Sequence, residues 1–283
     1  MSGGEITETS TSRFVMAGDV RMHLHEAGSG PVLLCVHGGA PGAYGWGNFG
    51  QNVAELAQRF RVIVVDLPGY GSSDQPDLSS GPFATYAGIL RGLLDAMAIP
   101  RAHVVGLATG GGAAMMMAIN HPEVVDRLVL VSSAGGLPLF TPTPSEGQKR
   151  IQSYYRGDGP SLASMREYLE MIVHDHSLIT DEIVQQRYDA SVAPAFAAHA
   201  PEGGASRRAN EQVWRDMDRI QAKTLVVWGR NNRVQGYDNA LFMLNRIPDV
   251  EVHIYGSTGL WVPFERRAEF NRLLVAFLEP DAG

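Results

Sequence analysis

The chain has 283 residues, 45% hydrophobic and 19% charged, so it is long and apolar enough to bury a sizeable core. Its formal net charge is −7, and its Lys and Arg residues are scattered singly, which argues against a nucleic-acid-binding protein. No apolar run approaches the length of a membrane span, and residues 1–13 hold no apolar signal-peptide core. The sequence therefore predicts a soluble cytoplasmic protein, with neither nucleic acid nor membrane among its partners.

Short apolar segments alternate with longer helical patterns along the chain. Residues 13–17 and 21–25 predict an antiparallel hairpin at a sheet edge. The single cysteine, Cys35, lies in an apolar run and predicts a small buried hydrophobe rather than part of a disulfide or metal site. Six nearly continuous apolar segments rich in β-branched residues predict parallel strands covered on both faces, namely residues 32–36, 62–65, 104–105, 128–131, 225–227 and 252–254.

The strand signals stop between Gly136 and about Arg215, where proline and glycine punctuate the chain. Residues 161–173 and 181–190 predict amphipathic helices there, and residues 193–209 predict a loop. Residues 263–278 predict a closing amphipathic helix. The pattern predicts an α/β protein with a mostly parallel sheet and helices on both faces, whose core (1–136 and 216–283) carries an inserted helical lid (137–215).

Two glycine-rich turns follow predicted strands. The first has the sequence HGGAPG at 37–42, where consecutive glycines let backbone N–H groups approach a ligand. The second has the sequence GLATGGG at 106–112 and leads into a helical run. Small residues on both sides of position 108 are typical of a strained strand-to-helix turn, the nucleophile elbow, with Ala108 where serine belongs.

With these motifs in order, the chain resembles the α/β-hydrolase superfamily and, within it, the C–C bond hydrolases that cleave meta-ring-fission products. The resemblance is nearly full length, and the proline-containing loop at 37–43 and the lid segment are specific to that branch. It implies an α/β-hydrolase fold. Its motifs are HGGAPGA (37–43), DLPGYGSSD (66–74), HP (121–122), SLITDE (177–182), QRY (186–188), WGR (228–230) and EFNR (269–272), with Trp46 and Asn48.

The chain departs from the family at three positions. The resemblance implies that the serine, aspartate and histidine of the family's catalytic triad correspond here to Ala108, Asn232 and Leu260. Loss of such a triad costs on the order of 10⁶ in turnover. The sequence therefore predicts that the serine mechanism has been abandoned.

Other residues are poor replacements for the triad. Thr109 follows the elbow position, so its backbone N–H faces the site and its hydroxyl does not. His37 and His121 are expected to tie loops together, and His253 sits near a strand end. In the lid, His174 and His176 lack a visible third ligand, so no metal is predicted. In the loop after residues 62–65, Asp66 and Asp74 are expected to brace backbone amides.

A binding apparatus is expected to survive. By resemblance, the backbone amides of Gly39 and Thr109 form an oxyanion hole, which needs no side chain. Arg187 matches a lid arginine that reaches the substrate, against the alternative of a surface salt bridge. Asn48 and Trp261 match pocket-lining positions. Leu107 replaces an asparagine, so with Ala108 and Leu260 it makes the former reaction centre apolar.

The favoured expectation is an enzyme of proton transfer, an epimerase, isomerase or cyclase acting on a natural product or short peptide, in which the substrate supplies the acid–base group. In what it lacks, the chain resembles the bottromycin-type peptide epimerases. One alternative is a non-catalytic small-molecule binder, and another is a residual C–C or ester hydrolase. No cofactor is expected, and the resemblance makes a homodimer a reasonable expectation.

Overall fold

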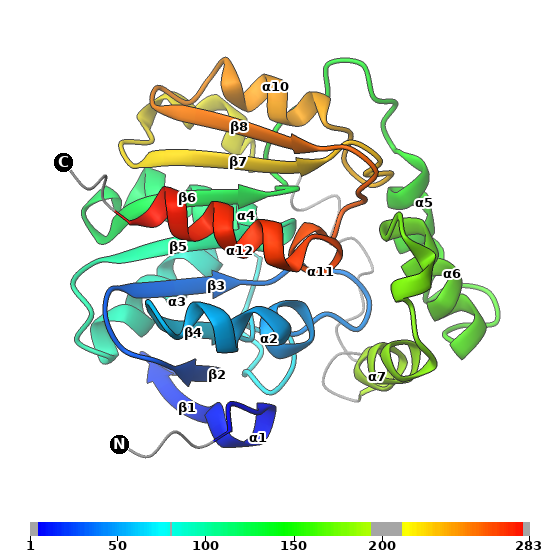
Figure 1. The fold of residues 1–283 in the computed structure, drawn as a ribbon, viewed down its shortest axis with the longest axis horizontal. Helices are drawn as coiled ribbons and strands as arrows, with labels where there is room; N and C mark the ends of the chain where they lie inside the picture. The colour runs from blue at the N-terminus through cyan, green and yellow to red at the C-terminus, as the bar shows by residue number, and fades with distance from the viewer. Residues whose placement is uncertain (1–4, 80, 194–210, 280–283) are drawn as a thin grey trace.

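The computed structural model describes residues 5–79, 81–193 and 211–279. Its strands form one sheet with the order β1-β2-β4-β3-β5-β6-β7-β8. β2 pairs antiparallel with β1 and with β4, and the other neighbours are parallel (Figure 1). The strands are β1 (Ser12–Ala17), β2 (Val20–Ala27), β3 (Val32–Val36), β4 (Arg61–Val65), β5 (Ala102–Leu107), β6 (Val125–Val131), β7 (Lys223–Gly229) and β8 (Val250–Tyr255).

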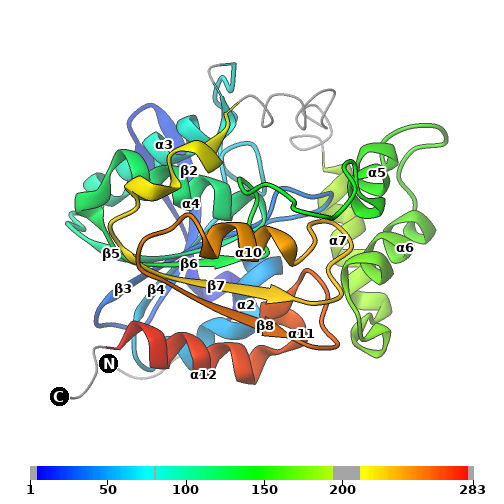
Figure 2. The same ribbon diagram turned by 90° about the horizontal axis from the view of Figure 1, so that it is seen from above.

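Helices cover both faces of the sheet, as predicted (Figure 2). α2 (Gly45–Leu56) and α12 (Arg267–Leu278) lie on one face, and α3 (Pro82–Ala96), α4 (Thr109–Asn120) and α10 (Asp238–Leu244) on the other. Successive strand residues point to opposite faces, so Leu33 and Cys35 pack in the core beside α2, while Leu34 and Val36 pack in the core beside α3. The near-continuous apolar runs are explained by this double burial.

Beyond the carboxyl ends of the parallel strands lie α5 (Glu146–Ser153), α6 (Leu162–Ile172) and α7 (Asp181–Val192) (Figure 1). The loop predicted at 193–209 falls, apart from Ala193, outside the described residues. None of the described helices combines the length and the apolar character that crossing a bilayer requires. The remaining short helices are α1 (Glu8–Thr11), α11 (Val262–Glu265) and the 3₁₀ turns Pro122–Val124, His176–Leu178, Val213–Arg215 and Met217–Arg219.

Two local expectations need correction. The closing segment is two helices, because Arg266 leaves the helical region (φ −123°, ψ 38°) while its guanidinium donates to Thr258 Oγ1 (2.9 Å). The segment before α6 holds a further helix, α5. Its signal is a capping box in which Gln148 N–H donates to Ser145 Oγ (3.1 Å) and Ser145 N–H donates to Gln148 Oε1 (3.0 Å).

Candidate active site

The turn between β5 and α4 holds Ala108 in a strained conformation. Its φ is 48° and its ψ is −112°, a combination that residues with a side chain rarely adopt. The backbone is fixed on both sides, because Ala108 N–H donates to Val131 O (2.9 Å) and Ala134 N–H donates to Ala108 O (2.8 Å). A Cβ on Gly106 would lie 2.5 Å from Gly110 O, so only glycine fits there. Strand pairing and glycine packing together hold Ala108 just beyond the carboxyl end of β5.

The glycine loop after β3 lies directly against this turn. A Cβ on Gly38 would come within 3.3 Å of the Ala108 Cβ, and a Cβ on Gly39 would lie 2.8 Å from Thr109 Oγ1. The Tyr70 hydroxyl also donates to Gly39 O (3.2 Å). Gly39 and Thr109, the two residues expected to act through their backbone, are therefore neighbours.

His37 anchors the start of this glycine loop. Leu67 N–H donates to His37 Nε2 (2.9 Å), so that nitrogen is unprotonated and Nδ1–H donates to Gly38 O (2.6 Å). Burial lowers the pKa of His37 to about 4, because the charged ring would lose its hydration. The ring is thus a neutral brace between the loops that follow β3 and β4, which is the role the sequence suggested.

Asn232 lies in the loop that follows β7. Its Oδ1 accepts hydrogen bonds from Val234 N–H (2.9 Å) and Gln235 N–H (3.0 Å), while its buried Nδ2 has no hydrogen-bond partner among the described residues. This loop is tied to the loop after β8, because Asn231 N–H donates to Thr258 O (2.8 Å). One side of the Asn232 amide therefore builds a turn, and the other side is unused.

Leu260 and Trp261 are buried at the end of the β8 loop. Leu260 N–H donates to Ile172 O at the end of α6 (2.8 Å), which joins this loop to the helices beyond the sheet. Trp261 Nε1 donates to Asn48 O on α2 (3.1 Å). Leu260 and Trp261 belong to the same apolar cluster as Leu107, and the partly buried Ala108 packs against it.

Arg187, on α7, is a buried cation only 5% exposed. Its Nη1 donates to Gly42 O (3.1 Å), its Nη2 donates to Gly47 O (3.1 Å), and its Cζ lies 4.4 Å from the centroid of the Trp261 ring. Burial lowers its pKa. Among the described residues no carboxylate lies within ion-pairing distance, so the surface salt bridge considered from the sequence is not formed. Arg187, Trp261 and Asn48 form one contiguous set.

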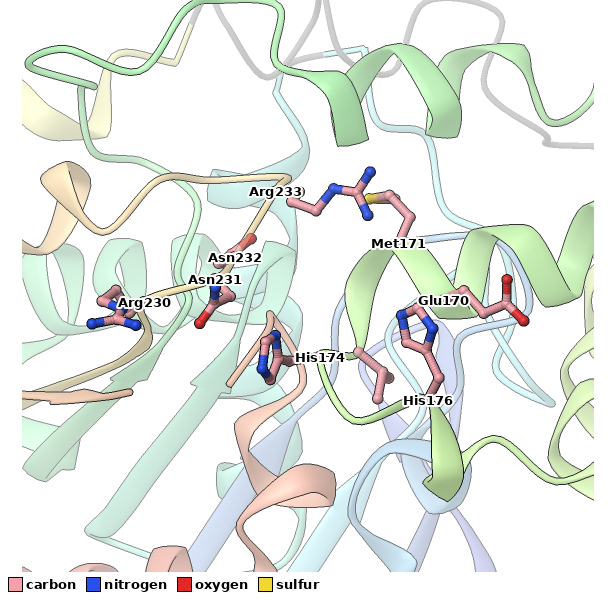
Figure 3. A pocket seen from close by; sticks show the side chains of 9 residues that line it. Glu170, Met171, His174, His176, Arg230, Asn231, Asn232 and Arg233 are labelled. Atoms are coloured by element: carbon pink, nitrogen blue, oxygen red, sulfur yellow. The ribbon is translucent and has the colours of Figure 1, made fainter. Parts of the chain in front are cut away.

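Figure 3 shows a cavity of about 260 Å³ beside the loop that follows β7. Asn232 and Arg233 line it together with His174 and His176. Ala108, Leu260 and Arg187 are not among its lining residues. Within the described ranges, no three His, Cys, Asp or Glu side chains are grouped so that they could hold a metal ion.

Glu265 is an organising residue that the sequence did not single out. Its Oε1 accepts from Gly259 N–H (2.7 Å) and its Oε2 from His174 N–H (2.7 Å), so it joins the β8 loop to the segment after α6. Burial raises the pKa of Glu265, partly offset by these hydrogen bonds. The only sequence signal is an acidic residue directly after the apolar segment 260–264.

The fold and this arrangement of loops define an α/β hydrolase, and a family model for the alpha/beta hydrolase fold matches residues 31–266. The chain belongs to this family and to its meta-cleavage product hydrolase branch. It is 37% identical to a 2-hydroxy-6-oxononadienedioate/2-hydroxy-6-oxononatrienedioate hydrolase of Paraburkholderia phymatum, covering 96% of this chain and 97% of that protein.

Two further relatives belong to the same branch. A 2-hydroxy-6-oxo-6-phenylhexa-2,4-dienoate hydrolase of Burkholderia cepacia is 34% identical, covering 97% of this chain and 98% of that protein. The solved structure of a meta-cleavage product hydrolase from Pseudomonas fluorescens IP01 is 30% identical with a TM-score of 0.85, covering 95% of this chain and 98% of that one.

These relatives correct the functional expectation. The epimerase, isomerase or cyclase on a natural product or peptide is wrong, because proteins that match almost the whole chain are hydrolases. The resemblance to peptide epimerases rested only on the residues expected at the triad positions, Ala108, Asn232 and Leu260. The residual C–C hydrolase, held as an alternative, fits these relatives.

The buried His37 predicts a pH dependence of stability. Its pKa is about 4 when folded and near 6.5 in the unfolded chain, so below pH 6.5 the unfolded state takes up a proton first. His37 therefore makes the free energy of unfolding fall as the pH drops from 6.5 to 4, by up to about 3 kcal/mol. Measured by urea unfolding across this pH range, the free energy of unfolding should fall less steeply in His37→Gln than in the wild-type protein.

The exposed His253 supplies the control, since His253→Gln should keep the wild-type slope. NMR titration of the wild-type protein gives a second readout that does not depend on the variant folding. A His37 ring resonance that titrates near pH 6.5 would contradict the buried neutral assignment.

Proposed function

We propose that this chain hydrolyses a carbon–carbon bond in a 2-hydroxy-6-oxo-dienoate, without a serine nucleophile. The observation that carries the proposal is the near full-length match to hydrolases named for such acids. The strained turn at Ala108, held against the glycine loop, supports it, because that backbone geometry serves a reaction at this point. We assign residues 137–215 as a lid, with the substrate between this lid and the core.

The substrate class matches the charges of the site. The acids named for the relatives carry a carboxylate beside the 2-hydroxy group and a ketone at carbon 6. Arg187 has five N–H donors, and two of its nitrogens donate to Gly42 O and Gly47 O, which leaves donors for a carboxylate. The hydrocarbon part is assigned to the partly buried Ala108 and the apolar cluster of Leu107 and Leu260 against which it packs.

In the proposed reaction the Gly39 and Thr109 backbone amides stabilise the oxyanion that forms when water adds to the carbon-6 ketone. Before the water adds, the proton of the 2-hydroxy group passes to carbon 5, which gives the 2,6-dioxo form. The bond between carbons 5 and 6 then breaks, its electron pair passes through carbons 3 to 5 to the 2-oxygen, carbon 6 leaves as a carboxylic acid, and the 2-oxygen takes up the proton that the added water releases. Ala108, Asn232 and Leu260 occupy the triad positions in this proposal and none of them can deprotonate the water. A site of this kind retains an acceleration of on the order of 10³–10⁴ over the uncatalysed reaction.

Cleavage of 2-hydroxy-6-oxo-6-phenylhexa-2,4-dienoate tests the proposal directly. We expect slow formation of benzoate and 2-hydroxypenta-2,4-dienoate, about 10⁶-fold below a triad enzyme, measured by chromatography. Because no serine takes part, pretreatment with a fluorophosphonate should leave this rate unchanged. A cleavage rate no higher than that in buffer without the protein would contradict the proposal.

A non-catalytic binding protein is the second candidate. It is favoured by the apolar cluster in which Leu260 and Leu107 lie and against which Ala108 packs, because these side chains offer no group for proton transfer and suit a hydrophobic ligand. The test monitors binding of the same dienoate by its absorbance. Binding without release of benzoate would support the non-catalytic binding protein.

Restoring the three side chains tests the positional assignment. In the triple variant Ala108→Ser, Asn232→Asp, Leu260→His, one carboxylate oxygen can keep the bonds from Val234 and Gln235 while the other faces the imidazole. We expect hydrolysis of p-nitrophenyl acetate at least about 100-fold above the parent. Ala108→Ser alone should bring no gain, and a gain from it would reveal another base.

Removing the buried cation tests substrate binding. Arg187→Ala should weaken dienoate binding by about 1.5–3 kcal/mol, or roughly 10- to 150-fold in Kd, since a charge-assisted hydrogen bond is lost. Calorimetric titration measures this, with thermal unfolding as a check on folding. Arg166→Ala is the matched control, because that neighbouring arginine on α6 pairs with Asp181. An equal loss of dienoate affinity in both variants would show that Arg187 does not bind the substrate.

A further inference from the structure

A hydroxyl, an imidazole and a carboxylate are linked by hydrogen bonds at a place remote from Ala108. Ser12 Oγ is 2.8 Å from His23 Nε2, and His23 Nδ1 is 2.7 Å from Asp66 Oδ2. Ser12 begins β1 and His23 lies on β2, which Figure 1 shows at one end of the sheet, while Asp66 follows β4. The order and spacing are those of a base-activated serine.

The surrounding hydrogen bonds fix the proton on His23. Asp66 Oδ1 accepts from Gly45 N–H (2.7 Å) and Oδ2 accepts from Ser72 N–H (2.9 Å). Burial alone would raise the pKa of Asp66, but these bonds and that from His23 leave it lowered. The ionised carboxylate only accepts, so His23 Nδ1 carries the proton and, in the neutral ring, Nε2 accepts from the Ser12 hydroxyl.

Solvent exposure falls from Ser12 through His23 to Asp66, so the hydroxyl is accessible and the carboxylate is not. Ser12 is exposed, the His23 side chain is 10% exposed and that of Asp66 only 2%. An electrophile can therefore reach the hydroxyl, while water is kept from the carboxylate that orients the base. Thr11 Oγ1 contacts His25 Nδ1 (3.1 Å), and burial lowers the pKa of His25, so this second ring stays neutral beside His23.

The surface beside Ser12 is apolar. Phe14 is 48% exposed and Met16 52% exposed, and both share the face of β1 on which Ser12 lies, because side chains alternate along a strand. The Phe14 ring centroid is 5.0 Å from that of His23, and the Arg21 guanidinium lies 4.5 Å from the Phe14 centroid. An aromatic or aliphatic ester fits such a surface.

We propose that Ser12 is a nucleophile that accepts an acyl group from aryl esters. Its Oγ attacks the ester carbonyl while its proton passes to His23 Nε2. The tetrahedral intermediate then expels the aryl alcohol, which recovers that proton. Water, deprotonated by the same imidazole, later releases the acid and regenerates Ser12, and Asp66 acts as a positioning residue through His23. In the sheet order β4 and β3 separate this site from β5, so β1 lies roughly 19 Å from the Ala108 strand.

The experiment treats the whole protein with p-nitrophenyl butyrate, follows nitrophenolate release and maps the adduct by mass spectrometry. We expect one butyryl group on Ser12, its loss in Ser12→Ala, and no change in Ser153→Ala, an exposed serine whose hydroxyl bonds only a backbone carbonyl among the described residues. His23→Ala should acylate at least about 100-fold more slowly.

Added imidazole should restore acylation of Ser12 in His23→Ala, which a merely structural histidine would not allow. An adduct elsewhere, no adduct, or an unchanged rate in a folded His23→Ala would overturn the proposal. The dienoate assay on Ser12→Ala keeps the two sites apart, because carbon–carbon cleavage should persist when acylation is gone.

Discussion

The strained backbone at Ala108 is the constraint on which the carboxyl edge of the sheet depends. Holding a residue at φ 48° and ψ −112° costs of order 1–3 kcal/mol, which the hydrogen bonds to Val131 and from Ala134 offset. The methyl side chain of Ala108 cannot act as a nucleophile, an acid or a base. What the turn does achieve is to start α4 at Thr109 and bring that residue against Gly39.

A second set of braces fixes the loops around that turn. His37 joins the loop after β3 to Leu67, and Asp66 holds both Gly45 at the start of α2 and Ser72. Each brace satisfies backbone groups at the end of a strand, where the ladder no longer supplies partners. Asp66 is therefore shared, since the carboxylate that shapes the loop after β4 also orients His23.

Sequence patterns were sufficient to predict the sheet, because doubly buried strands show continuous apolar runs and a turn joins the two segments of the edge hairpin. The sequence could not predict contacts set by tertiary structure. It missed the break at Arg266, whose cause is a bond to Thr258, and the neighbours of Arg187, which come from two distant loops. Ser12, His23 and Asp66 stand 11 and 43 residues apart, with no motif between them.

Asn232, at one of the three proposed triad positions, uses its side chain to build a turn. A carboxylate at position 232 could accept the same two N–H bonds, but a buried charge costs more to desolvate than a neutral amide. An amide keeps the two bonds that form the turn and leaves only Nδ2 unpaired, at about 1–3 kcal/mol. The turn that it builds explains why this buried position is polar.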